Sequence, residues 1–342
     1  MSDDYLWDPS GPPDPEIERL ERALGRLRTT APAPDFAAIG PAAARAARYV
    51  GSRFLGPALA AAAVIALMVG AAWQSTRTTT SWHVARVSGT PRIGARGVSD
   101  ASRLAIGETL ATDASSTARV EVSTVGEVTI AENTRVRLVD ARDAHYQLAL
   151  ERGSLHAVIT APPGQFVVNT PSATATDLGC VYTLRVEEDG TGLLSVAAGW
   201  VAFEDTGRES FVPAGASSRT SPHNGPGTPS YDDADAAFQQ ALQIVDAERS
   251  DARRPDALRT VVTRARGRDA MTLWHLIPRV SAAERSTVVD ALAARVAMPR
   301  GVTRDAVMRL DRDALDRWWD ALGLLDAGWW RKWKQPIAAL RN

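Results

Sequence analysis

The feature that most constrains this chain is a stretch of twenty residues, Phe54 to Trp73, without a charged side chain. A helix rises about 1.5 Å per residue, so one of this length would cross the roughly 30 Å hydrocarbon core of a bilayer. Backbone amides inside lipid must be satisfied within their own segment, which leaves a single apolar span no alternative to a helix. Pro57 fits the first turn, where its missing N–H would have no partner. The sequence therefore predicts a single transmembrane helix over residues 54–73.

Two other interpretations compete for this stretch. A helix buried in a soluble core usually keeps a polar face, and this stretch has none. The small residues Gly70-Ala71-Ala72 resemble a signal-peptide cleavage site. The apolar region of a signal peptide, however, has about 7–15 residues and follows a short basic start, whereas about fifty residues precede this one. We therefore interpret residues 54–73 as a retained span.

The basic residues beside the span predict its orientation. Arg45, Arg48 and Arg53 precede it with no acidic residue among them. A basic flank stays on the cytoplasmic side of a membrane. The expected location is the inner (cytoplasmic) membrane, with residues 1–53 in the cytoplasm and the C-terminal bulk in the periplasm or otherwise outside the cytoplasm.

Charge and residue usage exclude several classes of function. A formal net charge of -1 argues against direct nucleic-acid binding. Cys180 is the single cysteine, so neither an internal disulfide nor a paired-cysteine metal or redox motif can form. The five histidines lack the spacing of metal ligands, and no phosphate-binding loop or dinucleotide fingerprint is present. We expect a protein that is not an enzyme and has no cofactor or metal.

Residues 1–53 are predicted to form a partner-binding segment and a tether. Asp14 is a suitable N-cap for a helix that begins at Pro15, and the first turn is acidic. A helix of about fifteen residues is marginal alone in water, so its apolar stripe needs either a partner or a fold-back of Trp7. The candidate partner-binding residues are Leu6, Trp7, Ile17, Leu20, Leu24 and Leu27.

From residue 82 to residue 212 the period of the pattern changes to two. Apolar and polar residues alternate from Ala118 to Ser123, and further short alternating runs are separated by glycines. No segment of helix length with helical periodicity intervenes. This pattern predicts an all-β domain of about ten short strands, folded as a sandwich, roll or solenoid.

Several ordered blocks within residues 82–212 resemble the FecR domain, of the iron-dicitrate sensor type. They include Leu150-Glu151-Arg152-Gly153-Ser154-Leu155, Gln165-Phe166-Val167-Val168-Asn169-Thr170-Pro171, Asp177-Leu178-Gly179-Cys180-Val181-Tyr182 and Val196-Ala197-Ala198-Gly199-Trp200-Val201. Cys180 stands where the family pattern has Thr. The resemblance implies structural roles for Gly153, Phe166, Val168, Leu178, Gly179 and Gly199. It also implies a single-pass regulator whose cytoplasmic segment binds an extracytoplasmic-function sigma factor while the exported domain receives a signal.

The rest of the chain is predicted to be a linker and a helical domain. Residues 213–229 are rich in Ser, Pro and Gly, as linkers are. Residues 230–342 contain capping-box starts at Ser230-x-x-Asp233 and Ser281-x-x-Glu284. Breaks at prolines and a glycine divide this region into short antiparallel pairs, as in HEAT-like arrays. Its apolar stripes comprise Phe238, Leu242 and Val245, then Leu258, Val261 and Val262, then Val288, Val289, Leu292 and Val296.

The most aromatic stretch lies near the C-terminus. Trp318, Leu322 and Leu325 are expected to close the core of the helical domain. Trp329, Trp330 and Trp333 stand beside basic residues and are candidates for an interface with a membrane or a partner.

The expected fold class is multi-domain and mainly β plus α. It comprises a short cytoplasmic helix, a single transmembrane helix, an all-β FecR-like domain and a C-terminal helical, HEAT-like domain. The leading hypothesis is a membrane signalling regulator that modulates a sigma factor in response to an exported-side protein or envelope ligand. The alternative is a non-catalytic envelope scaffold that binds proteins or polysaccharide. A carbohydrate-active enzyme is disfavoured because paired carboxylates at a recognisable spacing are absent from the sequence.

Overall fold

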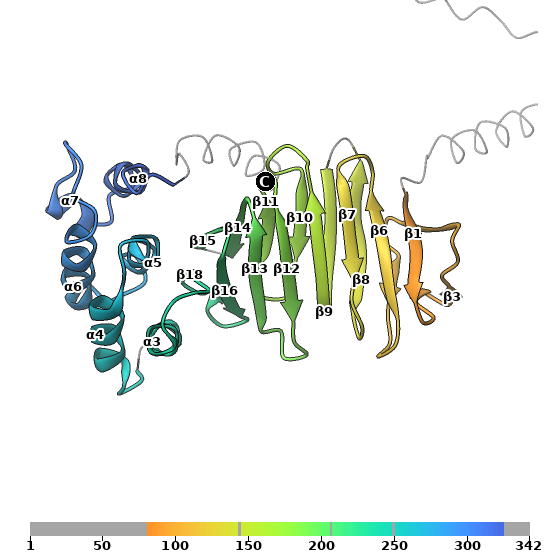
Figure 1. Cartoon of the computed structure of the whole chain (residues 1–342), viewed down its shortest axis with the longest axis horizontal. Coiled ribbons are helices and arrows are strands. Elements are labelled where there is room, and N and C mark those ends of the chain that lie inside the picture. Colours follow the sequence, from red (N-terminus) through yellow and green to blue (C-terminus); the bar gives the residue numbers. More distant parts are fainter. Residues whose placement is uncertain (1–80, 143–144, 206, 248–249, 325–342) are drawn as a thin grey trace, which may run out of the picture. The chain divides into compact units, whose positions relative to one another are not determined.

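The computed structural model describes residues 81–142, 145–205, 207–247 and 250–324 (Figure 1). Strands β1 to β18 occupy residues 81–231, and six helices follow in the described part of the chain. The predicted cytoplasmic segment 1–53 and the predicted span 54–73 lie outside the described residues.

The predicted fold class is wrong in including a single transmembrane helix. Across the described ranges, no helix is both long enough and apolar enough to cross a bilayer. The longest of them, α6 (Ala282–Ala293), has 12 residues. At about 1.5 Å per residue it is well short of a roughly 30 Å hydrocarbon core. What the structure shows is a β-rich body with six short helices. The side of a membrane assigned to each segment stays a prediction.

The strands form two sheets that share one strand. Sheet A has the order β4, β1, β6, β7, β9, β12, β13 and β16, with β17 and β18 beside β16. Its strands are β4 (Ser102–Ala105), β1 (Ser81–Ser88), β6 (Thr117–Val122), β7 (Gly126–Ile130), β9 (His145–Ile159), β12 (Val181–Val186), β13 (Gly192–Ala198), β16 (Ala216–Ser221), β17 (Gly225–Pro226) and β18 (Ser230–Tyr231).

Sheet B has the order β3, β2, β5, β8, β9, β10, β11, β14 and β15. The pair β9–β10 is parallel and the other pairs of the two sheets are antiparallel. Besides β9, its strands are β3 (Arg96–Gly97), β2 (Arg92–Ile93), β5 (Thr109–Ala111), β8 (Arg135–Arg142), β10 (Phe166–Asn169), β11 (Thr174–Asp177), β14 (Trp200–Asp205) and β15 (Arg208–Pro213).

Strand β9 passes from sheet B to sheet A at Gly153. Its first half pairs with β8, and its second half pairs with β7 and β12. Gly153 has a φ of 92°, and a Cβ added there would lie 2.4 Å from the Cα of Thr134. Both the left-handed backbone and the lack of space require glycine at this point. The FecR-type glycine therefore makes the bend that joins the two sheets.

The core lies between the two sheets. Alternate residues of each strand point inward because successive side chains on a strand face opposite sides. The largest fully buried side chains of this cluster include Tyr182, Phe166, Phe203, Leu138 and Leu155. They come from both sheets, so the fold is a two-sheet sandwich, one of the three predicted forms of the all-β domain.

The predicted linker over residues 213–229 is not a linker in the structure. Strands β16 and β17 lie within it, and Gly225 to Pro229 are buried. The inward positions of β16 are Ala216, Ser218 and Thr220. Ser218 Oγ donates to Gly227 O at 2.9 Å, and Thr220 Oγ1 donates to Ser172 O at 3.2 Å. Small polar residues fill the inward face of β16 because their hydroxyls find partners there, so the sequence lacked the usual apolar strand signal.

The helices are α3 (Ala236–Asp246), α4 (Arg254–Arg264), α5 (Ala270–Leu276), α6 (Ala282–Ala293), α7 (Arg304–Met308) and α8 (Arg312–Asp320). The predicted capping box at Ser281 and Glu284 is present at the start of α6. The one predicted at Ser230 is wrong, because Ser230 lies in β18 and Asp235 caps α3. Helix stripes that include Phe238, Val261, Val288 and Trp318 form one buried cluster, and the Trp318 indole donates to Val296 O at 3.2 Å.

The described sheets and helices contact each other at the edge of strand β15. The described residues from Ser81 to Leu324 belong to one compact unit, and in Figure 1 the helices follow the β14–β18 end of the sheets. Strand β15 pairs with β14 on one side, so its other edge needs partners. His275 accepts a hydrogen bond from Phe211 N at 3.0 Å, and Arg279 Nη2 donates to Glu209 O at 2.7 Å. Residues in and just after α5 thereby complete the edge of the sandwich.

Candidate functional site

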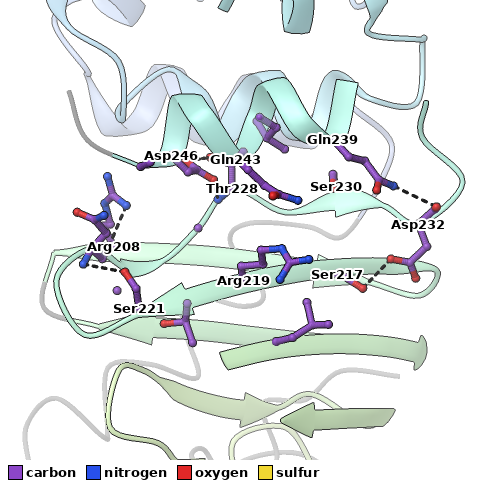
Figure 2. Close-up of a pocket in the computed structure, with 17 residues that line it drawn as sticks. Arg208, Ser217, Arg219, Ser221, Thr228, Ser230, Asp232, Gln239, Gln243 and Asp246 are labelled. Atoms are coloured by element: carbon purple, nitrogen blue, oxygen red, sulfur yellow. Dashed lines mark hydrogen bonds between the residues drawn. The ribbon is translucent and has the colours of Figure 1, made fainter. Parts of the chain in front are cut away.

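A pocket of about 410 Å³ lies between the last strands of sheet A and helix α3 (Figure 2). The outward residues of β16, Ser217, Arg219 and Ser221, line the side of the sheet. Gln239 and Gln243 line the side of α3, where a spacing of four residues places both on one helix face. The outward-facing side chains of β16 therefore form one wall of the pocket, and one face of α3 forms the opposite wall.

Hydrogen bonds already engage the carboxylates of this pocket. Asp246 accepts from Thr228 through both oxygens, at 2.5 Å from the backbone nitrogen and 2.6 Å from Oγ1. Asp232 Oδ1 accepts from Ser217 Oγ at 2.6 Å. Arg208 Nη1 donates to Asn224 O at 2.9 Å. These contacts fix the shape of the pocket before any ligand enters.

Arg219 differs from the other charged residues of the pocket. In Figure 2 its side chain lies above the sheet and beneath α3, on the side toward which Gln243 points. Within the described ranges, neither the Arg219 guanidinium nor the Gln243 amide has a hydrogen-bond partner. A guanidinium has five N–H donors in a fork that matches a carboxylate. The pocket thus offers a cation that the protein itself does not neutralise.

A second group of polar residues lies inside the sandwich. Asp177 is 1% exposed, and its two carboxylate oxygens accept from Cys180 Sγ at 2.7 Å and from Gly179 N at 2.6 Å. Burial raises the pKa of Asp177 to about 7, although these hydrogen bonds oppose the shift. Burial and the nearby Asp177 carboxylate raise the pKa of the Cys180 thiol, so it stays protonated. A protonated, buried thiol is a poor nucleophile, which argues against a catalytic role for Cys180.

Tyr182 is a further member of this buried group. Its hydroxyl is buried without a hydrogen-bond partner in the part of the chain that the structure describes. Burial, with an added effect of Asp177, raises its pKa. An unpaired buried hydroxyl costs free energy, so the group is a strained part of the core and not a solvent-facing site.

The residues that the FecR resemblance singled out serve the sandwich. Phe166 and Val168 on β10 are fully buried. Leu178 N donates to Trp200 O at 3.2 Å, which holds the strand ends around Gly179 and Gly199 together. Gly199 has a φ of 73°, and a Cβ there would lie 2.1 Å from Gly179 O. None of the six FecR-type residues, Gly153 included, lines the pocket.

The remaining predicted site residues cannot be placed. Leu6, Trp7, Ile17, Leu20, Leu24 and Leu27, and also Trp329, Trp330 and Trp333, lie outside the described residues. Among the side chains that are described, no three His, Cys, Asp or Glu residues gather as metal ligands.

Sequence reasoning missed the pocket because its residues fell in the predicted linker. Arg219, Ser217 and Ser221 belong to β16, whose sequence, Ala-Ser-Ser-Arg-Thr-Ser, has no large apolar residue. A possible signal was the alternation of small inward residues with Ser217 and Arg219. The contribution of α3 could not be read, because the approach of α3 to β16 is a tertiary contact.

Comparison with known proteins finds one family match within the β-rich part of the chain. The family model described as FecR protein matches residues 108–202, less than half of the chain. Two crystal structures of a "putative anti-sigma factor" from Parabacteroides distasonis ATCC 8503, at 1.65 Å and 2.50 Å resolution, align at 17% identity and a TM-score of 0.33. Both alignments cover 40% of this chain, and 64% and 63% of the solved chains, which is less than two thirds of their length. No curated protein sequence matches the chain.

The matched residues run from just before β5 into β14, and they include the bend at Gly153 and the buried residues of β10. The resemblance stated from the sequence blocks is confirmed over this range. Residues 108–202 of this chain match the FecR family model.

Proposed function

We propose that this protein regulates a sigma factor, with its N-terminal segment as the sigma-binding part and its FecR domain as the part that receives a signal. The observation that carries the proposal is the match of residues 108–202 to the FecR family model. The amphipathic pattern of Ile17, Leu20 and Leu24 supports it, because such a short helix is stable when its apolar stripe meets a partner.

The body described by the structure suits a receiving part. Its sheets and helices form one unit, so a ligand or partner that contacts the helices would also affect strands β15 to β18. Coupling of this kind needs contiguous packed contacts between two sites. Hydrogen bonds from His275 and Arg279 supply such contacts between the α5 region and sheet B.

The test is co-purification of the full-length chain from the cells that produce it, followed by identification of bound sigma factors. We expect one sigma factor with the wild-type protein and none with the double variant Leu20→Asp, Leu24→Asp. Val87→Asp is the matched control, because Val87 is an apolar residue that is 54% exposed on the described body. The transcripts of the genes that the captured sigma factor controls should change in cells with the double variant. They should stay unchanged in cells with the control variant. The proposal fails if wild-type protein captures no sigma factor, or if the double variant captures it equally well.

The same experiment separates regulation from the scaffold alternative. A scaffold would capture envelope proteins or polysaccharide in both the double variant and the Val87→Asp control. The transcripts of sigma-dependent genes would then be the same in both.

A further inference from the structure

The pocket between β16 and α3 is lined by two arginines and two aspartates. Arg208 and Arg219 line it, and neither forms an ion pair with a described residue. Both oxygens of the Asp246 carboxylate accept hydrogen bonds from Thr228. Asp232 is the remaining carboxylate of the lining, and it accepts a hydrogen bond from Ser217. Both carboxylates are thus engaged by neutral donors, whereas the Arg219 guanidinium is left for a ligand with a negative charge.

The same pocket provides neutral hydrogen-bonding groups around Arg219. The Gln243 amide and the Ser230 hydroxyl have no partner among the described side chains and backbone groups, and Ser221 Oγ accepts from Asn224 N at 3.3 Å. Amides and hydroxyls can each donate and accept, as a ligand rich in hydroxyl groups requires. In Figure 2, Gln243 and Ser230 lie on the α3 side of Arg219, and Ser221 lies farther along β16, near Arg208.

Two leucines add an apolar part to the lining. Leu193 projects from β13 next to Arg219 in the register, and Leu242 comes from α3. Apolar surface with a few well-placed polar groups is typical of small-molecule sites, and a volume of about 410 Å³ is within their usual range. A bare inorganic anion would leave the leucines and the Gln243 amide without contacts.

We propose that this pocket binds a hexuronate, a sugar acid with one carboxylate and several hydroxyl groups. The Arg219 guanidinium holds the carboxylate through a two-pronged, charge-assisted pair of hydrogen bonds. Gln243, Ser221 and Ser230 contact hydroxyl groups, and the leucines contact the C–H surface of the ring. Asp232 disfavours ligands with several negative charges, because like charges repel in a partly enclosed pocket. This site is additional to sigma-factor binding and does not depend on it.

The test is isothermal titration calorimetry of the purified full-length chain with D-glucuronate as the probe. D-glucose is the comparison ligand because it has the same ring and lacks the carboxylate, and inorganic phosphate tests a simple anion. We expect D-glucuronate to bind, and D-glucose and phosphate to bind at least about tenfold more weakly, since one charged hydrogen-bonding contact is worth about one factor of ten or more.

Two arginine variants make the test specific. Arg219→Gln should weaken D-glucuronate binding by about tenfold to a hundredfold. Arg185→Gln is the matched control. Leu193 on β13 pairs with Arg219 on one side and with Arg185 on the other, so the two arginines lie in one row across sheet A. Arg185 does not line the pocket. The control should bind as the wild type does. Arg219 and Arg185 are both exposed, so neither change should alter the melting temperature of the free protein.

Four outcomes would overturn the proposal. They are no binding of D-glucuronate by the wild type, equal binding of D-glucose, equal binding of phosphate, and an unchanged affinity in Arg219→Gln. Gln243→Leu provides a second check from the helix side and should weaken D-glucuronate binding while leaving the free protein folded. Because the titration contains no sigma factor, its failure would leave the proposed regulatory function standing.

Discussion

Nε2 of His275 lies 3.0 Å from the backbone nitrogen of Phe211 and accepts its hydrogen bond. Nδ1 of the same ring lies 2.8 Å from Met271 O, so the proton of the neutral imidazole is on Nδ1. Burial, with a smaller effect of Arg279, lowers the pKa of His275 to about 3. A neutral side chain from a helix therefore completes the edge of strand β15. This hydrogen bond joins the helical region to the last strand of sheet B.

The first prediction is that His275→Phe destabilises the protein by about 2 kcal/mol, because the buried N–H of Phe211 loses its acceptor. Phenylalanine keeps a ring next to Trp274 and Trp319, whose centroids lie 5.1 Å and 5.4 Å from that of His275. The loss therefore reports on the hydrogen bond more than on packing. Urea unfolding measures it, with the exposed His156→Phe as the control. Equal stability of His275→Phe and the wild type would contradict the edge-completing role.

The second prediction concerns pH. The folded-state pKa of Asp177, about 7, is above its ordinary value of 3.8, so the folded protein binds more protons than the unfolded chain between these pH values. The contribution of Asp177 to stability is fully present below about pH 4 and is lost as the pH rises through 7. His275 acts in the opposite direction, because its lowered pKa makes the folded state lose stability as the pH falls from 6.5 toward 3. The two effects partly cancel in the wild type.

Asp177→Asn removes the titrating group and keeps the size of the side chain. The amide oxygen can still accept from Gly179 N, while the NH2 group takes the place of the oxygen that faces Cys180 Sγ. The difference in unfolding free energy, variant minus wild type, should rise by about 3 kcal/mol between pH 4.5 and pH 8, at about 1.4 kcal/mol for each pKa unit. Chemical denaturation across this pH range is the measurement. A difference that stays constant with pH would show that Asp177 is ionised throughout.

The third prediction concerns the bend in β9. Gly153→Ala should cost at least about 3 kcal/mol or prevent folding, because the new methyl group would meet the Thr134 backbone and the φ of 92° is strained for alanine. Gly215→Ala is the control: its φ is 75°, but an added Cβ would meet no atom within 4 Å. It should cost about 1 kcal/mol. Thermal melts of both variants check the difference, and similar losses would show that space around Gly153 is not limiting.

The fourth prediction is that the sandwich and the helices unfold together. Far-UV circular dichroism and tryptophan fluorescence should give coincident urea transitions in the wild type, as for a single cooperative unit. Arg279→Met should separate them or lower both midpoints, because Arg279 donates to Glu209 O, Ser210 Oγ, Thr228 Oγ1 and Pro226 O. Arg185→Met, on the exposed face of sheet A, should leave the transitions coincident and unshifted. Two separate transitions in the wild type would mean that the helical region is an independent domain.

Local patterns determined the FecR domain. Period-two alternation, turn glycines and the ordered blocks from Leu150 to Val201 are properties of neighbouring residues, so they can be read directly from the chain. The capping box at Ser281 and the buried stripe of α3 could be predicted for the same reason.

Tertiary structure decided how the parts meet. Strand β16 was not predicted because its inward residues, Ala216, Ser218 and Thr220, are small or polar. The hydroxyls of Ser218 and Thr220 are satisfied by Gly227 O and Ser172 O, which only the fold brings to them. The pairing of His275 with Phe211 spans 64 residues, and the meeting of Arg219 with Gln243 depends on how α3 packs on the sheet. The chain alone therefore determines which segments can become strands and helices, since that depends on short-range geometry. The tertiary structure alone determines which polar groups share a pocket, because that depends on how the segments pack against each other.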